Sequence, residues 1–371
     1  MRLVSVNAGL AHVSTDFMIA ALLIYSLALL AFAGDYAFGR PRRKAAAAAA
    51  PVAQRAAQLA AVGAATAGTA SAGAAAAGGA VAGAPDPAVA GGPVNPAGPA
   101  ARPERPERPA GAFRAILEAG PWVTAAVSLS WLGILAHVVA VTTRGFAVHR
   151  APWGDMYEFI TALTCVAALF FGYILIKYRA WALGVFVMGA IVIALGLAET
   201  LIYTPAGPLV PALQSYWLSI HVTAMTLSSG IFFVATVLSI MYLVTERYRK
   251  RVAAGKAEAN PLLDRIPAAS QLDKLTYRAV VFGFPIWTFG VMAGAIWADQ
   301  AWGRYWGWDP VETWAFITWV IYAAYLHARA TGGWRGARAH YIQLLGFASL
   351  LTNIFVIQIF VTGLHSYAGV Q

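Results

Sequence analysis

The chain has 371 residues, of which 60% are apolar and 11% charged, and its mean hydropathy is +0.64. No soluble core could absorb so much hydrophobic side chain, so lipid must be the solvent for most of the chain. The formal charge of +10 is spread over separate short segments, which excludes a basic patch for nucleic acid. The composition therefore predicts an all-α polytopic protein of the lipid bilayer.

Apolar windows of about 20 residues, the length that crosses about 30 Å of hydrocarbon, recur along the chain. We expect about eight transmembrane helices, at 16–36, 122–142, 156–176, 180–199, 216–244, 279–298, 311–328 and 342–363.

Basic residues are divided unequally between alternate loops. One set of loops carries 22 of the 26 Lys and Arg residues, and the other carries only Arg2, Arg144, Arg150 and Arg304. Because basic loops stay cytoplasmic, both termini are predicted to be extracytoplasmic, in a multi-pass protein of the cell membrane.

The segment that follows the first span differs in composition from the rest. Ala31-Phe-Ala33 resembles a signal-peptidase site, but the basic cluster that begins at Arg40 favours a stop-transfer signal, so residues 1–39 are predicted to remain as an N-terminal transmembrane helix. Residues 40–112 are rich in Ala, Gly and Pro and are predicted to form a disordered cytoplasmic linker. Residues 113–371 then form the main membrane domain.

Cysteine is nearly absent. The single Cys165 lies inside the third predicted span, so the chain has no Cys-x-x-Cys pair, no Cys-x-x-Cys-His haem attachment site and no disulfide. The chain is therefore neither a c-type cytochrome nor a thiol oxidoreductase.

Six of the thirteen tryptophans fall between Trp297 and Trp319, where the chain reads Trp302-Gly-Arg-Tyr-Trp-Gly-Trp-Asp-Pro-Val-Glu-Thr-Trp314. An aromatic belt at the membrane interface accounts poorly for tryptophans packed with glycines, which instead allow close approach to a flat ligand. Asp309 is predicted to cap the next helix, with Glu312 as its capping-box partner. The outer arginines 144, 150 and 304 are candidates either for binding carboxylates of the ligand or for lipid headgroups.

Two histidines share the predicted outer side with this segment. His221 lies about a turn below the outer end of the fifth span, and His365 lies at the outer end of the last. An imidazole in a membrane needs a partner or a ligand. For the pair we favour axial ligation of a haem iron over interfacial hydrogen bonding.

The other histidines differ in depth. His327 lies about 24 Å from Val311 along its helix, so it cannot serve the same haem as the outer pair. We favour a ligand role for it at the cytoplasmic end over the alternative, a helix-end cation that meets the negative end of the helix dipole. For His137 a ligand role and a structural role stay open. His12, His149 and His340 are predicted to face solvent or headgroups.

These residues resemble a known family. Trp302 to Trp314, Tyr325-Leu-His-Ala-Arg329, Ala151-Pro-Trp-Gly-Asp-Met-Tyr-Glu158, Trp217-Leu-Ser-Ile-His221 and Gly363-Leu-His-Ser-Tyr367 are similar to motifs of the CcsA/CcsB/ResC-type proteins of system II cytochrome c biogenesis, which carry a WWD domain. The resemblance covers about residue 120 to the C-terminus. The family usually has Asn where Asp155 stands and often Lys where Val311 stands.

The resemblance implies the following roles. His221 and His365 ligate haem b, a transported substrate, over the WWD segment of Trp302, Trp306, Trp308, Asp309 and Trp314. His327 belongs to an inner haem position, whose second ligand comes from a ResB/Ccs1-type membrane partner. The chain then acts as a haem transporter within a cytochrome c haem lyase complex, with apocytochrome c and a thiol-reducing protein as further partners.

Two other functions are open to a chain of this kind. A respiratory b-type cytochrome with permanent haem would place two histidines on each of two helices, and the only similar pair here, His327 and His340, is separated by a glycine-rich loop. A proton-coupled solute permease would bury acidic residues in mid-span, whereas Glu158 and Glu199 lie near span ends.

Overall fold

The computed structural model describes residues 6–39, 111–208, 213–260, 262–331, 334 and 336–365. Within these ranges the chain is helical and holds no strand, which confirms the all-α prediction. The predicted linker at 40–112 lies outside the described residues except for its last two positions. The chain divides into two units, residues 1–37 with 116–371 and residues 38–115, and the first unit carries every feature described below.

Long helices make up the first unit. They are the N-terminal helix Ala8–Gly39, α3 (Pro121–Val148), α4 (Met156–Tyr178), α5 (Gly184–Leu201), α6 (Tyr216–Ala253), α7 (Ala269–Trp302), α8 (Pro310–Ala330) and α9 (Ala337–Leu351). The short elements are α2 (Ala112–Glu118), the 3-10 turns Trp181–Leu183 and Leu263–Arg265, the π-helix Thr352–Ile357 and α10 (Gln358–Phe360).

Seven of the described helices are long and apolar enough to cross a membrane, so the chain is a multi-pass membrane protein. They match seven of the expected spans, and the span expected at 311–328 forms α8, which is not among them. With 21 residues α8 is about 31 Å long, which equals the hydrocarbon thickness. Its tryptophans, tyrosines, Glu312 and Arg329 lower the hydropathy of this span.

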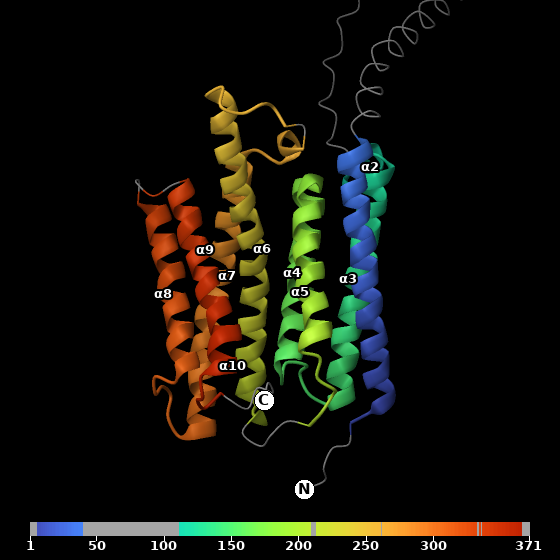
Figure 1. Ribbon diagram of the computed structural model, residues 1–371. Helices are drawn as coiled ribbons and strands as arrows, with labels where there is room; N and C mark the ends of the chain where they lie inside the picture. The colour runs from blue at the N-terminus through green and yellow to red at the C-terminus, as the bar shows by residue number, and fades with distance from the viewer. Residues whose placement is uncertain are drawn as a thin grey trace, which may run out of the picture. The chain divides into compact units, whose positions relative to one another are not determined.

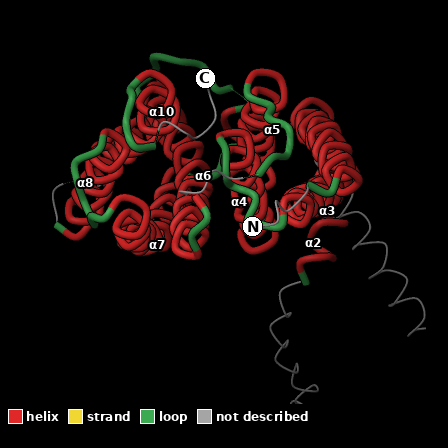
Figure 2. The backbone as a smooth tube through the Cα atoms, turned by 90° about the horizontal axis from the view of Figure 1, so that it is seen from below, coloured by secondary structure: helices red, strands yellow, loops and turns green. Residues whose placement is uncertain are grey.

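Helix α6 lies at the centre of the bundle. Figure 2 shows α3, α4 and α5 on one side of it and α7, α8 and α10 on the other, and α6 packs against α4, α5, α7 and α9. Two glycines allow this packing: a Cβ at Gly230 would lie 2.7 Å from Leu163 O of α4, and one at Gly283 would lie 2.7 Å from the Phe232 ring of α6. Small residues at such positions let membrane helices approach closely.

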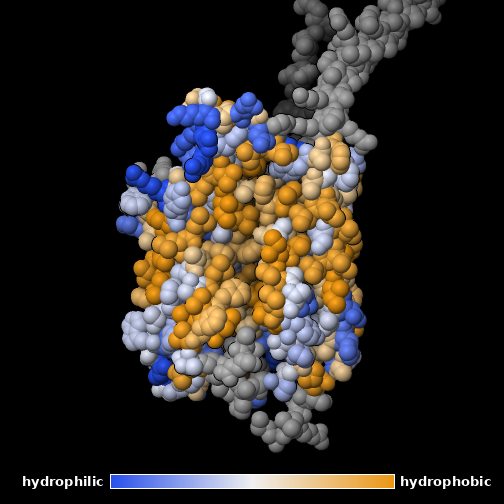
Figure 3. Space-filling view, in the orientation of Figure 1, coloured by the Kyte–Doolittle hydropathy of each residue, from blue (hydrophilic) through white to orange (hydrophobic). Residues whose placement is uncertain are grey.

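The helices run side by side along the bundle (Figure 1). Figure 3 shows a hydrophobic band between more polar ends on the viewed face. Exposed side chains of this kind include Leu23, Leu30, Ile193, Phe282 and Met292. Surfaces this apolar are expected where lipid replaces water.

A buried ionic cluster joins α3 to the start of α4. Glu158 accepts hydrogen bonds from Arg144 Nε at 2.9 Å, from Arg150 Nη1 at 2.6 Å and from Gly154 N at 2.8 Å, and its side chain has no exposed surface. Arg144 also donates to Thr204 O at 2.6 Å. The structure thus gives Arg144 and Arg150 a buried carboxylate of the protein as their partner, where the sequence suggested carboxylates of the ligand or lipid headgroups.

The prediction for His340 is wrong. Its imidazole is fully buried, with Nδ1 3.0 Å from Ser239 Oγ and Nε2 3.2 Å from Asp273 Oδ1, and it stacks on Tyr242 at 3.8 Å between ring centroids. Asp273 in turn accepts two hydrogen bonds from Arg329. The cluster joins α6, α7, α8 and α9, which explains why a histidine is tolerated inside the bundle.

The remaining histidines of this group are simpler. The His137 imidazole is buried, with Nδ1 3.4 Å from the Tyr25 hydroxyl, so it joins α3 to the N-terminal helix, while its Nε2 has no hydrogen-bond partner among the described residues. His12 and His149 are exposed, as expected.

The Glu158 cluster gives a stability prediction. Glu158→Gln removes the carboxylate that pairs with both guanidinium groups and leaves Asp155, 3.9 Å from Arg144, as the nearest counter-charge, and loss of one partner of a buried ion pair costs about 3 to 5 kcal/mol. We expect a lower midpoint of thermal unfolding in detergent, followed by the reaction of Cys165, which is buried in the folded state, with a thiol dye.

The matched control is Lys250→Gln, which breaks an exposed ion pair with Glu246 on α6. Its midpoint should stay close to that of the unmodified protein, because exposed pairs contribute little. Equal midpoints for the two variants would show that the Glu158 cluster does not stabilise the fold.

Candidate functional site: an aromatic cavity with two imidazoles

Two residues with a left-handed backbone shape the turn between α7 and α8. Gly303 ends α7 with a left-handed φ of 71°, and Trp308 also has a positive φ, 56°, which is strained for a bulky residue. Asp309 Oδ1 then accepts from Val311 N, while Glu312 Oε2 accepts from Asp309 N and from Gly307 N. The predicted capping box is thus confirmed.

His221 projects from α6 onto the backbone of α7. Its Nδ1 lies 2.7 Å from Gly290 O, so Nδ1–H donates to this carbonyl. A Cβ at Gly294 would lie 2.6 Å from the same ring atom, so no larger residue fits there without moving the imidazole. Gly290 and Gly294 are four residues apart, the spacing by which small residues bring membrane helices together.

His365 is held by Asp309, 56 residues earlier in the chain. Its Nδ1 lies 2.7 Å from Asp309 Oδ1, and Leu364 N donates to Asp309 Oδ2 at 2.7 Å. A Cβ at Gly363 would lie 2.6 Å from the same Oδ2. Burial alone would raise the pKa of Asp309, but the hydrogen bonds from His365, Leu364 N and Val311 N outweigh it and lower the pKa. Asp309 therefore carries its negative charge at neutral pH.

Both imidazoles keep one nitrogen available. Among the residues that the structure describes, no hydrogen bond involves Nε2 of His221 or of His365. Metal-ligating histidines typically show this arrangement, in which one ring nitrogen is fixed by an acceptor and the other binds the metal.

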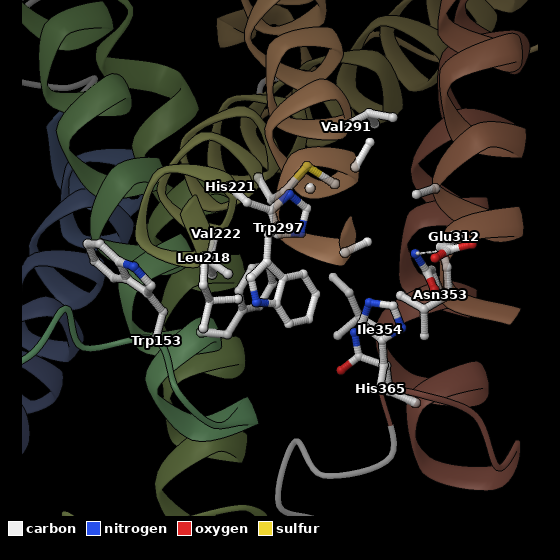
Figure 4. Close-up of a pocket in the computed structure, with 18 of the residues that line it drawn as sticks. Trp153, Leu218, His221, Val222, Val291, Trp297, Glu312, Asn353, Ile354 and His365 are labelled. Atoms are coloured by element: carbon white, nitrogen blue, oxygen red, sulfur yellow. Dashed lines mark hydrogen bonds between the residues drawn. The ribbon is translucent and has the colours of Figure 1, made fainter. Parts of the chain in front are cut away.

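Two tryptophans hold the imidazoles together. Trp297 is parallel to His221, with ring centroids 6.2 Å apart, and contacts His365 at 5.7 Å. Trp302 contacts His365 at 4.9 Å and Trp297 at 4.8 Å. Figure 4 shows the two imidazoles facing the same space, with Trp297 beside both. Two histidines 144 residues apart in sequence are thus brought to one cavity.

The cavity lies between α6, α7, α8, the π-helix and the segment before α4. It has a volume of about 170 Å³ and is partly open, with mostly apolar walls. This is about the size of a cavity that binds benzene, so one planar ring fits within it. Further lining residues are Trp153, Asp155, Trp306, Glu312, Asn353 and Ile354.

The predicted site residues divide into those that line the cavity and those that do not. His221, His365, Trp302 and Trp306 line it. Trp308 is 64% exposed and meets the edges of Trp306 and Phe316 outside the lining, Trp314 is also outside the lining, and Asp309 acts through His365. The Arg304 guanidinium lies 3.7 Å from Glu312.

His327 is far from this cavity. It lies near the end of α8, four residues before Thr331, and its side chain is exposed. The structure therefore does not bring His327 together with the outer pair, in agreement with the distance expected along the helix.

Several lining residues were not singled out from the sequence, among them two tryptophans and an asparagine. Trp297 lay in the tryptophan-rich window, but nothing local distinguished it from its neighbours. Asn353 lies in the π-helix, with Nδ2 3.3 Å from Val311 O and a buried Oδ1 that has no hydrogen-bond partner. Trp153 also has a buried, unpaired Nε1. The Gly290-x-x-x-Gly294 spacing was a usable signal, because it marks where α7 meets the helix that carries His221.

The fold and the site define a polytopic helical membrane protein with two imidazoles in an aromatic cavity at one end of the bundle. The profile of the family described as Cytochrome C assembly protein matches residues 153–365, which includes both histidines. The chain belongs to this family, and it is a cytochrome c biogenesis protein.

Curated relatives named cytochrome c biogenesis protein CcsA agree with this assignment. The chain is 36% identical over 253 residues to the cytochrome c biogenesis protein CcsA of Heterosigma akashiwo, covering 60% of this chain and 79% of that protein. It is 34% identical over 316 residues to CcsA of Gloeobacter violaceus, covering 70% and 89%. Among solved structures it is similar to cytochrome c heme lyase CcmF, with a TM-score of 0.48 and 21% identity over 66% of this chain and 43% of that one.

Asp155 gives a prediction with a defined pH dependence. Burial, together with the nearby charge of Glu158, raises the pKa of Asp155 from 3.8 to about 6. The folded state therefore binds this proton more tightly than the unfolded state, and stability is lost as the pH rises from about 4 to about 6. Asp155→Asn removes the titration, while Asn still accepts the capping hydrogen bond from Glu158 N. Its thermal midpoint should exceed that of the unmodified protein by a margin that grows over this pH range.

Asp155→Ala is the control, because it loses the cap as well and should lack the gain at neutral pH. The opposite result, in which Asp155→Asn is the less stable protein at pH 7, would mean that the carboxylate is needed as a partner of Arg144, 3.9 Å away.

Proposed function

We propose that the chain exports haem b across the cell membrane and presents it at an extracytoplasmic site for attachment to apocytochromes c. In this proposal His221 and His365 bind the haem iron through Nε2, and the WWD segment around Trp302 and Trp306 contacts the porphyrin. The observation that carries it is the pair of imidazoles with Nδ1 fixed and Nε2 free of hydrogen bonds, facing one aromatic cavity.

Haem is the substrate of this site. Paired imidazoles protect the iron, while a cavity that encloses only part of the porphyrin leaves the vinyl groups accessible. Each thiol of a Cys-x-x-Cys-His segment adds across a vinyl double bond, sulfur to one carbon and hydrogen to the other. The thiols must be reduced beforehand, which requires a thiol-reducing protein. This chain contributes position, because its one cysteine is buried elsewhere.

An inner haem position at His327 is part of the proposal. Its imidazole is exposed on α8 and so is accessible to a second protein. We propose that a ResB/Ccs1-type partner supplies the other inner ligand there. The alternative of a b-type cytochrome that pairs His327 with His340 is opposed by the hydrogen bonds at both nitrogens of His340.

Haem binding tests the outer site. The protein purified in mild detergent is expected to show the spectrum of a six-coordinate haem, and His221→Ala or His365→Ala should lower its haem content at least about tenfold, since each removes an iron ligand. His12→Ala, which alters an exposed histidine, is the control and should retain haem. Unchanged haem in both cavity variants would contradict the proposed site.

Orientation is tested by labelling. In a Cys165→Ser background, a cysteine at Tyr305, which is 60% exposed in the turn before α8, should react with a membrane-impermeant thiol reagent in intact cells. A cysteine at Lys256, exposed in the loop between α6 and α7, should react only after the membrane is disrupted. The reverse pattern would place the cavity on the cytoplasmic side and exclude presentation outside the cell.

A further inference from the structure

The two cavity imidazoles are held by chemically different acceptors. His221 donates to a neutral backbone carbonyl, Gly290 O, whereas His365 donates to the carboxylate of Asp309, and both distances are 2.7 Å. The two hydrogen bonds have the same length, but only the acceptor of His365 carries a negative charge. A carboxylate draws the Nδ1 proton more strongly than an amide oxygen and so leaves more electron density on Nε2.

We propose that Asp309 is a positioning residue that makes His365 the persistent ligand of the haem and leaves His221 as the ligand that the incoming apocytochrome histidine replaces. The inference rests on the proposed function, because it assigns unequal roles to the two ligands of that site. An imidazole backed by a carboxylate binds iron more firmly, and ferric iron above all.

The surroundings of Asp309 support this role. Its side chain is 3% exposed, and both of its oxygens accept hydrogen bonds. The donors are His365 Nδ1 and Leu364 N in the C-terminal segment and Val311 N at the start of α8. One carboxylate thus fixes both the ring and the backbone of the residue before it. Gly363 has no room for a Cβ beside Oδ2, so the sequence preserves this close approach.

The surroundings of His221 fit the exchangeable role. Its acceptor is a backbone carbonyl that no side-chain substitution can turn into an anion, and its ring lies against Gly294 with no charged neighbour in hydrogen-bond contact among the described residues. Loss of the iron bond would leave Nδ1 still bonded to Gly290 O. The ring then stays in place and can rebind haem after the product leaves.

Ligand exchange tests the proposal, with free imidazole as the probe in place of the apocytochrome histidine. Imidazole added to the haem-loaded full-length protein should give a species with the same spectrum and midpoint potential as His221→Ala with imidazole, because His365 is the ligand retained in both. His365→Ala with imidazole should release haem at least about tenfold faster than His221→Ala with imidazole. Equal release rates, or a retained ligand that matches His365→Ala, would overturn the inference.

Asp309→Asn tests the charge on the acceptor of His365. Asn keeps one oxygen that can cap the helix and accept from His365, so it makes the two imidazoles alike in having neutral acceptors, while its amide nitrogen cannot accept from Leu364 N and that hydrogen bond is lost. We expect a higher midpoint potential and roughly tenfold faster haem release than in the unmodified protein. Ser215→Ala is the control, because it removes the cap of α6 at Trp217 N without touching the imidazoles, and it should change neither value.

The outcomes distinguish a failure of the proposed function from a failure of the role proposed for Asp309. If the unmodified protein and every variant lack haem, the proposed function fails. If His221→Ala and His365→Ala lose haem but Asp309→Asn keeps the original potential and release rate, the proposed function stands and the role of Asp309 is refuted. Should Asp309→Asn fail to fold, the comparison of the two histidine variants still decides which ligand persists.

Discussion

Hydrocarbon offers no hydrogen bonds, so every polar side chain inside this bundle must find its partner within the protein. That constraint sorts the histidines. His340 engages both ring nitrogens, with Ser239 and Asp273, and joins four helices. His221 and His365 engage only Nδ1, and each turns its other face to an aromatic cavity. The same side chain is therefore structural at one position and suited to bind metal at another, and the difference lies in whether its second nitrogen meets a polar group of the protein or faces the cavity.

Local signals predicted where the spans lie and where α8 starts. Apolar length located the spans, and Asp309 followed three residues later by Glu312 predicted a capping box, since both depend on residues near in sequence. The meeting of His221 with His365 was also expected, because helices that alternate in direction bring their outer ends to one side. The span expected at 311–328 is a helix, α8, although it is not among the seven that are long and apolar enough to cross a membrane.

Long-range partners could not be read from the sequence. The position of His340 at the start of the last span suggested that it faces solvent or headgroups. Its partners, Ser239 and Asp273, lie 101 and 67 residues earlier in the chain, so its burial could not be predicted. Arg144 and Arg150 looked like free outer cations because nothing local revealed that Glu158 folds back between them. Similarly, nothing in the sequence distinguished the tryptophans of the turn from one another. In the structure Trp308 has a left-handed backbone and an exposed ring, and it does not line the cavity.

The size of the cavity bears on whether a ligand there is stored or handed on. A permanently bound haem needs a pocket that encloses most of its surface, as sites for bound cofactors do. Here the walls formed by Trp297, Trp302 and Trp306 enclose only about 170 Å³, and the C-terminal segment that carries His365 is held mainly through one carboxylate. A haem bound through both imidazoles would keep part of its edge outside the walls. Tight retention would then depend on the two iron bonds, and replacing either bond would be enough to begin release.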